Sequence, residues 1–448
     1  MTEPIHRRPL GHTSRQSATG DSARHANALF LTGTLFGMGL MLLILKVWGP
    51  SEEPDIAHYR EVRDLVRDSF VAEVGEDELL ESALRGMLRE LDAYSDYYVE
   101  EEAAEVNQDT SGHKVGIGVI MRNADGPQVL FPVQGSPAEA AGLRVGDRFL
   151  ELDGHATADM SPEEVSRRMR GEPGTLLDVR VRGLDGLERA HEISRRQLLI
   201  PSVRRKRLLD PQLGVGYVAL KSFTNATPAE FDEALEGLRQ RGMKGLVLDL
   251  RGNNGGVLSA AVELAQRFLE EGVITSTEGR GVPHVERADA EFTPYLNLPL
   301  VVLVNGDSAS ASEILAGALQ DHRVAVLVGE PTYGKGVVQT ISRYPQERAI
   351  AKVTTSYYYT PTHRSLERGE GEEAYGLLPD ILVASVPEET DAFDRWLQRP
   401  YDPHESVLAE LEAWEEQAGI DLGLSPPRDS QLEAAVALFR GEPPSAPR

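Results

Sequence analysis

The stretch that decides the fold spans residues 300–340 and reads LVVLVNGDSASASEILAGALQDHRVAVLVGEPTYGKGVVQT. Its apolar start at 300–304 predicts a buried strand, and a second apolar run at 324–329 predicts another. Between them, apolar residues at helical spacing predict a helix over 312–319. Strand, helix and strand at this spacing favour an α/β unit whose neighbouring strands are parallel.

The same alternation continues toward the N-terminus. Apolar runs at 215–220 (VGYVAL) and 245–250 (GLVLDL) predict two more strands, and helices are expected at 228–241 and 258–269. We therefore expect one α/β domain over 199–395, built on a largely parallel sheet.

Three alternating serines, at positions 308, 310 and 312, follow the first strand of the opening stretch. A serine there has a helix N-terminus beside it, where backbone N–H groups and the helix dipole favour a developing negative charge. Ser310 and Glu313 also form the S-x-x-E pattern of a capping box, so Ser310 taken alone is a helix cap. A catalytic role would require a base as well.

Lys335, in the turn YGKG, is the candidate base. The histidine nearest to Ser310 in sequence is His322, and its neighbour Asp321 would point in another direction on a helix, so it is badly placed to orient the ring. Of the 46 basic residues, seven are Lys and 46 − 7 = 39 are Arg. Arg does not give up its proton whereas a partly buried Lys can, so a lysine here favours a Ser–Lys dyad.

Three motifs make the pattern specific: DLRGNNGG at 249–256, SASASEI at 308–314 and GEPTYGKGVVQ at 329–339. Together they resemble the signature of the carboxyl-terminal processing proteases, also called tail-specific proteases, and the resemblance covers about residues 56–390. It implies an α/β fold with a crotonase/ClpP-like ββα catalytic core and an inserted PDZ domain. It also implies hydrolysis of peptide bonds through an acyl-enzyme.

The resemblance assigns roles to individual side chains. By its motifs Ser310 is the nucleophile, Lys335 is the general base and Gln339 orients the lysine. Asp321 falls on a position that is often acidic in the family, and we expect it to be structural. Asp249 is expected to support its turn, as is Arg251, rather than to take part in the chemistry.

Backbone amides form the oxyanion hole in this family. The candidates in this sequence are Gly255 or Gly256, together with Ala311. The alternative for residues 253–256 is a plain turn from strand to helix, which they must form in either case.

The segment that follows departs from the family pattern in three places. His363 replaces the usual glycine of a turn, RGEGEEAY at 368–375 looks like an insertion, and GLLPD at 376–380 replaces the G-I-x-P-D motif. All three lie outside the proposed dyad, so they bear on substrate fit more than on activity.

A small domain precedes the α/β domain, over 106–198. Strands are predicted at 115–121, 128–133, 148–152 and 176–182, with short helices at 136–143 and 161–170. The run QGSPAEAAGLRVGDRFLELDG (134–154), with VGIGV before it, is similar to the PDZ domains of bacterial proteases. The peptide C-terminus is then expected at Val115, Gly116, Ile117, Gly118 and Val119.

Two readings of this small domain stay open. The glycines at 116 and 118 serve either a carboxylate-binding loop or tight turns alone. Arg170 either couples the PDZ domain to the active site or is a solvated charge.

The N-terminal region predicts a membrane anchor. Residues 28–45 carry no charge, and a transmembrane signal anchor is expected over 28–48 because 18 helical residues span about 27 Å, close to the bilayer core. Arginines in the tail 1–27 place that tail in the cytoplasm, so the catalytic part lies in the periplasm or otherwise outside the inner membrane. A cleaved signal peptide and a buried core helix are the alternatives.

Helical segments are expected at both ends of the folded part. Residues 51–105 form a helical N-terminal region, with a hairpin of helices at 55–74 and 76–91. Residues 396–448 form a helical C-terminal extension, with helices at 402–416 and 430–439.

Composition excludes several classes of function. The net charge of 46 − 71 = −25 argues against nucleic acid as a partner, and it gives strongly acidic substrates no electrostatic steering. The absence of cysteine removes disulfides, a thiol nucleophile and Cys-ligated zinc. With no HExxH motif and no P-loop, no metal, nucleotide or other cofactor is expected.

The expected partners are protein or peptide substrates with accessible C-termini, the inner membrane, a second copy of the chain and an activating adaptor. Two other functions compete with proteolysis. One is a catalytically silent PDZ adaptor at the membrane, and the other is an acyl-CoA enzyme on a related crotonase-like sheet. The presence of both Ser310 and Lys335 disfavours the adaptor, and a PDZ domain disfavours the acyl-CoA enzyme.

Overall fold

The computed structural model describes residues 37–38, 41, 54–123, 126–346, 348–368, 376–399 and 401–442. The chain divides into two compact units, Met1–Ala83 and Leu84–Arg448. The expected anchor at 28–48 lies almost entirely outside the described residues, as does most of the predicted insertion at 368–375. No helix within the described residues is long and apolar enough to cross a bilayer.

The N-terminal unit contains α2 (Pro54–Ser69) and the start of α3 (Glu76–Arg89), whose last turns belong to the second unit. The predicted pair of helices is present, although α2 ends at Ser69, five residues before the predicted end at 74. α2 buries none of its residues, and Leu65 is 63% exposed. The apolar stripe of this helix is therefore not covered within the described chain.

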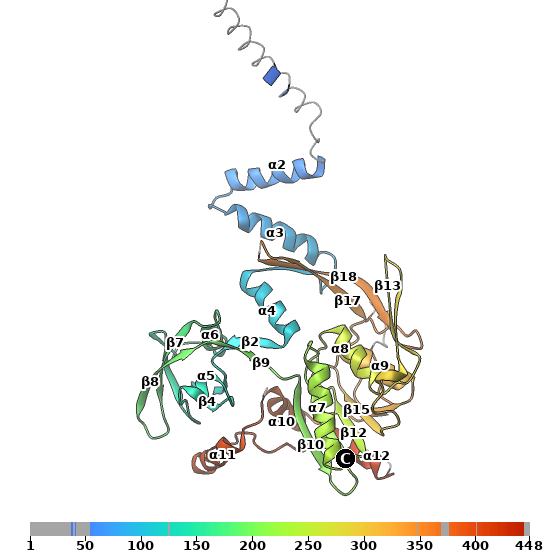
Figure 1. Ribbon diagram of the computed structural model, residues 1–448. Coiled ribbons are helices and arrows are strands. Elements are labelled where there is room, and N and C mark those ends of the chain that lie inside the picture. The colour runs from blue at the N-terminus through green and yellow to red at the C-terminus, as the bar shows by residue number, and fades with distance from the viewer. Residues whose placement is uncertain are drawn as a thin grey trace, which may run out of the picture. The chain divides into compact units, whose positions relative to one another are not determined.

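The second unit is built around a six-stranded sheet in the order β10-β11-β12-β15-β16-β19, of which Figure 1 labels β10, β12 and β15. All neighbours are parallel except β10 and β11, so the predicted parallel sheet is present. The strands are β10 (Val203–Asp210), β11 (Val215–Leu220), β12 (Gly245–Asp249), β15 (Leu300–Val304), β16 (Ala325–Gly329) and β19 (Ile381–Leu382).

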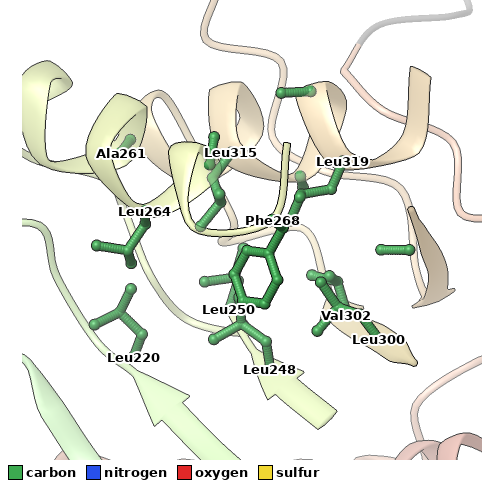
Figure 2. Close-up of a cluster of buried hydrophobic side chains, with 14 of the residues drawn as sticks. Leu220, Leu248, Leu250, Ala261, Leu264, Phe268, Leu300, Val302, Leu315 and Leu319 are labelled. Atoms are coloured by element: carbon green, nitrogen blue, oxygen red, sulfur yellow. The ribbon is translucent and has the colours of Figure 1, made fainter. Parts of the chain in front are cut away.

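Helices cover both faces of this sheet, which is why its strands read as continuous apolar runs. One face packs against α7 (Thr227–Gln240), α8 (Leu258–Gln266) and α9 (Ala311–Asp321). Figure 2 shows part of this core, where Leu248 and Val302 from the sheet meet Leu264 and Leu315 from the helices.

The opposite face of the sheet packs against C-terminal helices. Phe393 of α10 (Pro387–Gln398) and Ala434 of α12 (Ser430–Phe439) join Val247 in one apolar cluster. The segment predicted as an extension at 396–448 thus supplies α12 to the core of the α/β domain. α10 was not foreseen as a separate helix.

A second sheet carries the region of Lys335. Its order is β1-β18-β13-β14, and β17 pairs with β18 in an antiparallel hairpin. Its strands are β1 (Asp96–Val99), β13 (Val273–Gly279), β14 (His284–Arg287), β17 (Val337–Tyr344) and β18 (Ala349–Tyr359). A 3-10 turn at Ala290–Phe292 and α4 (Glu100–Ser111), which follows β1, complete this part of the unit.

The small domain has a sheet in the order β3-β4-β5-β7-β8, with β3 at its edge. The bounds are β3 (Val119–Asn123), β4 (Pro127–Pro132), β5 (Arg148–Leu152), β6 (His155–Ala156, beside β5), β7 (Leu176–Arg182) and β8 (Glu188–Ser194). β2 (His113–Gly116) pairs with β9 (Arg196–Leu199), and the helices are α5 (Pro137–Ala140) and α6 (Pro162–Met169).

The prediction of one strand over 115–121 is wrong. β2 ends at Gly116 and β3 begins at Val119, because the chain turns at Gly118 with a φ of +80°. A Cβ atom on Gly118 would overlap the side chain of Ser136, so this turn requires glycine.

The helix α11 (Glu405–Ala418) packs against this small domain rather than against the central sheet. Leu411 and Trp414 share an apolar cluster with Leu130 and Phe131 of the domain. The C-terminal region therefore serves two cores, one through α11 and the other through α12.

Candidate active site

The three alternating serines differ in what surrounds their hydroxyl groups. Ser308 is buried and donates to the carbonyl oxygen of Leu250 at 2.8 Å. Ser312 is also buried and donates to the carbonyl oxygen of Asn253 at 2.8 Å. Ser310 is half-buried and lines a cavity of about 910 Å³. Of these three, Ser310 is the one placed to react with a molecule in the cavity.

The backbone at Ser310 adopts an unusual conformation, with φ 57° and ψ −115°. A positive φ at a residue other than glycine stores about 1–3 kcal/mol of strain, and such residues concentrate at functional sites. Ser310 is also the N-cap of α9, and its N–H donates to the Glu313 carboxylate at 2.8 Å. The predicted capping interaction and the cavity position therefore occur together.

Glu313 joins the serine turn to the lysine turn. Its buried carboxylate accepts hydrogen bonds from the N–H of Ser310, the hydroxyl of Thr332 at 2.6 Å, the N–H of Gly334 at 2.8 Å and the N–H of Lys335 at 2.9 Å. Burial raises the pKa of this carboxyl, and its hydrogen bonds act in the opposite direction. Sequence reasoning treated Glu313 only as a capping partner and missed this role.

Lys335 lies on the same cavity as Ser310, half-buried at the start of the β17–β18 hairpin. Burial lowers the pKa of its ammonium group below the ordinary value of 10.5, the charge of Lys352 lowers it further, and Glu367 opposes both. The Lys335 Nζ atom lies 4.6 Å from the centroid of the Tyr94 ring. Within the described chain the Lys335 Nζ and Ser310 Oγ atoms share the cavity without a hydrogen bond between them.

Gln339 lies on β17 and lines the same cavity. Its amide nitrogen donates to the hydroxyl of Thr354 on β18, at 3.4 Å. Among the described residues its side chain makes no hydrogen bond to Lys335, so the expected orienting contact is not formed in this conformation.

The glycine turn at 252–256 packs directly against Ser310. A Cβ atom on Gly255 would lie 2.8 Å from the Cβ atom of Ser310, and one on Gly256 would overlap the carbonyl oxygen of Phe223. The N–H of Gly255 donates to the Asn253 side chain at 2.9 Å. The described residues provide no acceptor for the N–H groups of Gly256 and Ala311.

Tyr358 is a cavity-lining residue that the sequence gave no reason to select. It is 1% exposed, and its hydroxyl makes no hydrogen bond to any described residue. Ser310 is the hydroxyl side chain that faces it. Burial raises the pKa of the Tyr358 phenol well above its ordinary value, so it stays neutral and able to donate.

The acidic residues expected to be structural make structural contacts. Arg251 is buried and forms ion pairs with Asp249 and with Asp429, each at 2.6 Å. Asp321 pairs with Arg364 and accepts from Thr362.

Two further residues named from the sequence lie in other contacts. A ring nitrogen of His322 lies 2.7 Å from the carbonyl oxygen of Val273. His363 has a φ of 61°, a conformation that glycine adopts easily, and its ring stacks on Tyr359 with centroids 4.5 Å apart. This stacking provides a local reason why histidine is accommodated in the turn.

The small domain has a separate cavity of about 150 Å³. Residues 115–119, predicted to hold a peptide terminus, line it together with Met169 and Arg170 from the end of α6. The edge strand β3 and α6 flank it, the arrangement by which an extended peptide adds to a sheet.

Arg170 also contacts a residue outside the small domain. Its guanidinium pairs with Glu105 of α4 at 2.5 Å. Because α4 also packs against β1, this pair connects the small domain to the sheet that carries the lysine hairpin.

Comparison with known proteins agrees with this arrangement. Residues 214–383 match the model of peptidase family S41, and residues 131–183 match the model of the PDZ domain. The chain is 31% identical to a carboxy-terminal-processing protease of Bartonella bacilliformis over 92% of this chain and 95% of the other. It is 37% identical to a carboxyl-terminal-processing protease of Picosynechococcus sp. over 66% of this chain and 70% of the other.

Among solved structures, the photosystem II D1 C-terminal processing protease is similar, with 29% identity and a TM-score of 0.42 over 72% of this chain and 86% of that one. The Bartonella bacilliformis relative is matched over nearly its whole length, with the PDZ domain and the α/β domain both included. This chain therefore belongs to the carboxyl-terminal processing serine proteases of peptidase family S41.

Proposed function

We propose that this protease cuts peptide bonds through an acyl-enzyme on Ser310, with Lys335 as the general base. One observation carries the assignment. Ser310 is the only serine of the SASAS motif that lines the cavity, and Lys335 lines the same cavity with a lowered pKa. A lowered pKa increases the fraction of neutral amine available to accept the proton of the hydroxyl group.

The reaction begins with transfer of the Ser310 proton to neutral Lys335 as the serine oxygen attacks the scissile carbonyl. The negative charge that develops on the carbonyl oxygen is stabilised by the N–H groups of Gly256 and Ala311, each worth about 3 kcal/mol by analogy with other oxyanion donors. Gly255 supports this turn instead, because its N–H is bound to Asn253. Lys335 then protonates the leaving amine, and water releases the acyl group.

Gln339 is the proposed positioning residue for the lysine. Both residues belong to the segment that leads into and forms β17, and both line the cavity. The weak contact of Gln339 with Thr354, at 3.4 Å, would be exchanged for one with Lys335 when substrate is bound.

The test is cleavage of an unfolded protein by the full-length chain, followed by mass spectrometry. Ser310→Ala and Lys335→Ala are expected to lose cleavage, whereas Ser342→Ala and Lys244→Ala, which alter exposed residues, retain it. Cleavage by Ser310→Ala at the unmutated rate would overturn the assignment. Failure of every variant, the unmutated chain included, would favour a silent adaptor or an enzyme that requires an activator.

The PDZ domain is proposed to hold the substrate C-terminus at residues 115–119. Support comes from the cavity between β3 and α6. The Arg170–Glu105 ion pair is proposed to transmit peptide binding to the lysine hairpin through α4. Arg170→Gln should then reduce the effect of added C-terminal peptide on cleavage, without reducing binding of that peptide to the PDZ domain.

The remaining proposals concern location and assembly. A single anchor at 28–48 would hold the catalytic part outside the inner membrane, and the uncharged run at 28–45 supports it. A crotonase/ClpP-like core, a homo-oligomer and an activating adaptor are also proposed, from the family resemblance. Membrane fractionation with and without residues 1–50 tests the anchor, and mass measurement in detergent tests the oligomer.

A further inference from the structure

The lining of the large cavity has a charge opposite to that of the whole protein. Six basic residues line it and, among the described residues, no Asp or Glu does, although the net charge is −25. Four of the seven lysines of the chain are in this set, so cations are concentrated there. The six are Lys114, Arg204, Lys221, Lys335, Arg343 and Lys352.

Arg204, on β10, is the most unusual of these cations. Its Nε atom and one Nη atom are buried, and the described residues supply no acceptor for either. Burial and the charge of the adjacent Arg205 together lower the pKa of its guanidinium to about 10. Buried N–H donors of a charged group are costly to leave without acceptors, so this site favours an anion from outside the chain.

The nearest carboxylate does not satisfy Arg204. Glu230 contributes an attractive charge, but one of its oxygens already accepts from the N–H groups of Ser202 at 2.6 Å and Val203 at 3.1 Å. Its other oxygen is buried and also without a partner in the described chain. Glu230 therefore orders the start of β10 and does not bind the guanidinium.

Lys221 directly follows β11 and lies beside the start of β10. Its N–H donates to the carbonyl oxygen of Ser202 at 2.9 Å, two residues before Arg204. Its ammonium group donates to the carbonyl oxygen of Gly252, at the start of the glycine turn that leads to Gly256. The two cations thus lie on the wall of the cavity that ends at the proposed oxyanion donors.

Carboxylates elsewhere act on Lys221 only as surrounding charges. Burial lowers the pKa of its ammonium, and the charges of Asp394 and Asp307 partly oppose this effect. Neither carboxylate forms an ion pair with Lys221 among the described residues, and neither lines the cavity. An anion in the cavity would therefore meet Lys221 without competition from a neighbouring acid.

We propose that Arg204 and Lys221 form a subsite for a carboxylate of the substrate polypeptide, and that this protease prefers substrates with an acidic group near the scissile bond. The inference rests on the proposed function, since it places the subsite beside the oxyanion donors. A guanidinium binds a carboxylate through two parallel N–H groups, which suits Arg204. The carboxylate comes either from an Asp or Glu side chain or from the free C-terminus of the chain being cut.

A matched set of peptides separates these two sources. The parent peptide is fluorogenic and neutral apart from its free C-terminus. At each position around the scissile bond, one peptide carries Gln and its partner carries Glu. A second set carries a C-terminal amide. Hydrogen bonds to charged groups contribute about 1.5–3 kcal/mol, so the best Glu peptide should exceed its Gln partner in kcat/KM by about 10–100-fold. If the free terminus is the ligand, amidation should produce that loss instead.

Variants connect the preference to the two residues. For each variant, kcat/KM for the Glu peptide is divided by kcat/KM for its Gln partner, and kcat/KM for the free acid by that for the amide. In Arg204→Gln and Lys221→Gln the ratio that shows the preference should fall close to one. Arg204→Lys should recover part of the preference. Lys206→Gln is the matched control, because Lys206 lies on the same strand, is exposed and pairs with Glu233 outside the cavity. Circular dichroism identifies any variant that fails to fold.

Binding to the inactive Ser310→Ala chain keeps this test separate from the test of proteolysis. The same peptides carry a fluorescent label, and their anisotropy is measured at low and high salt. Tighter binding of the acidic peptide, weakened by salt and by Arg204→Gln, supports the subsite even if no cleavage is seen. Equal binding and equal cleavage of every Glu/Gln and acid/amide pair would overturn the inference while leaving the dyad intact.

Discussion

The carboxylate of Glu313 accepts the backbone N–H of Lys335 at 2.9 Å, although the two residues lie 22 positions apart. The same carboxylate binds the N–H of Ser310, so one buried acid joins the two turns that carry the proposed dyad. This relation holds the turn of Lys335, at the start of the hairpin, against the helix N-terminus that carries Ser310.

Glu313→Gln should reduce both activity and stability. An amide NH₂ group would face N–H or O–H donors where the carboxylate oxygen now accepts, so at least one buried donor loses its partner. The expected cost is about 1–3 kcal/mol of unfolding free energy, with a fall in kcat of at least about tenfold. Thermal unfolding and peptide cleavage measure the two effects. Glu412→Gln on the exposed side of α11 should change neither, and equal behaviour of the two variants would contradict the role of Glu313.

The pH dependence of cleavage should report the environment of Lys335. Because burial and the charge of Lys352 lower its pKa, kcat/KM should rise with pH and level off below the ordinary value of 10.5. Lys352→Gln removes the like charge, which raises the pKa of Lys335, so the inflection should move to higher pH and activity near neutrality should fall. Lys244→Gln at an exposed site should leave the inflection in place. An unmoved inflection in Lys352→Gln would contradict the electrostatic argument.

Gly256→Ala should nearly abolish cleavage. The added Cβ atom would overlap the carbonyl oxygen of Phe223, and the residue has a φ of 140°, so the turn must shift and the N–H of Gly256 with it. Loss of one oxyanion donor costs about 100–1000-fold in kcat. Gly242→Ala is the control, because Gly242 also has a positive φ but has open space around it. That variant should lose about 1 kcal/mol of stability through backbone strain and keep its kcat. Comparable losses of kcat in both would refute a specific role for Gly256.

How far the sequence predicts this fold depends on how each segment is buried. The strands at 215–220 and 300–304 were predicted nearly to the residue, because burial on both faces makes them continuous apolar runs. The hairpin of β17 and β18 was not, since most of its residues are exposed or only partly buried and form no continuous apolar run. α10 was missed as a separate helix because its apolar residues are few and are fixed by packing on a sheet formed elsewhere in the chain.

The site divides in the same way. Ser310 and Lys335 could be selected because their motifs are local and the chemistry restricts the residue types. The roles of Glu313 and Tyr358 depend on contacts with distant segments, which no local pattern encodes. The net charge suggested no attraction for acidic substrates, yet Arg204 and its neighbours give the cavity the opposite local charge. Net charge averages over a surface, whereas a binding site samples only its lining.

Tyr358→Phe tests whether the buried phenol acts on the nucleophile. Removing a hydroxyl group that makes no hydrogen bond within the described part of the chain should leave stability unchanged or raise it by about 1 kcal/mol. If the phenol donates to the Ser310 oxygen during the reaction, kcat should fall by about tenfold, the value of one neutral hydrogen bond. Tyr357→Phe, at the adjacent and half-exposed position, should alter neither quantity. A fully active Tyr358→Phe variant would restrict Tyr358 to packing.

Asp429→Asn tests whether α12 is part of the catalytic domain. Asp429 lies at the N-terminus of α12 and pairs with buried Arg251, which follows the central strand β12. Burial raises the pKa of Asp429, but Arg251 outweighs it, so the folded-state pKa lies below 3.8. The carboxylate therefore stabilises the fold above that pH, and the contribution is lost as pH falls through the lowered value.

Asp429→Asn should lower the unfolding free energy by about 3–5 kcal/mol at neutral pH and flatten this acid-side loss, as measured by denaturant titration at several pH values. Asp421→Asn, in the exposed connection before α12, is the control and should behave as the unmutated chain does. Equal stability of Asp429→Asn and the unmutated protein would mean that this ion pair does not anchor α12, with Arg251 held by Asp249 and Gln431 instead.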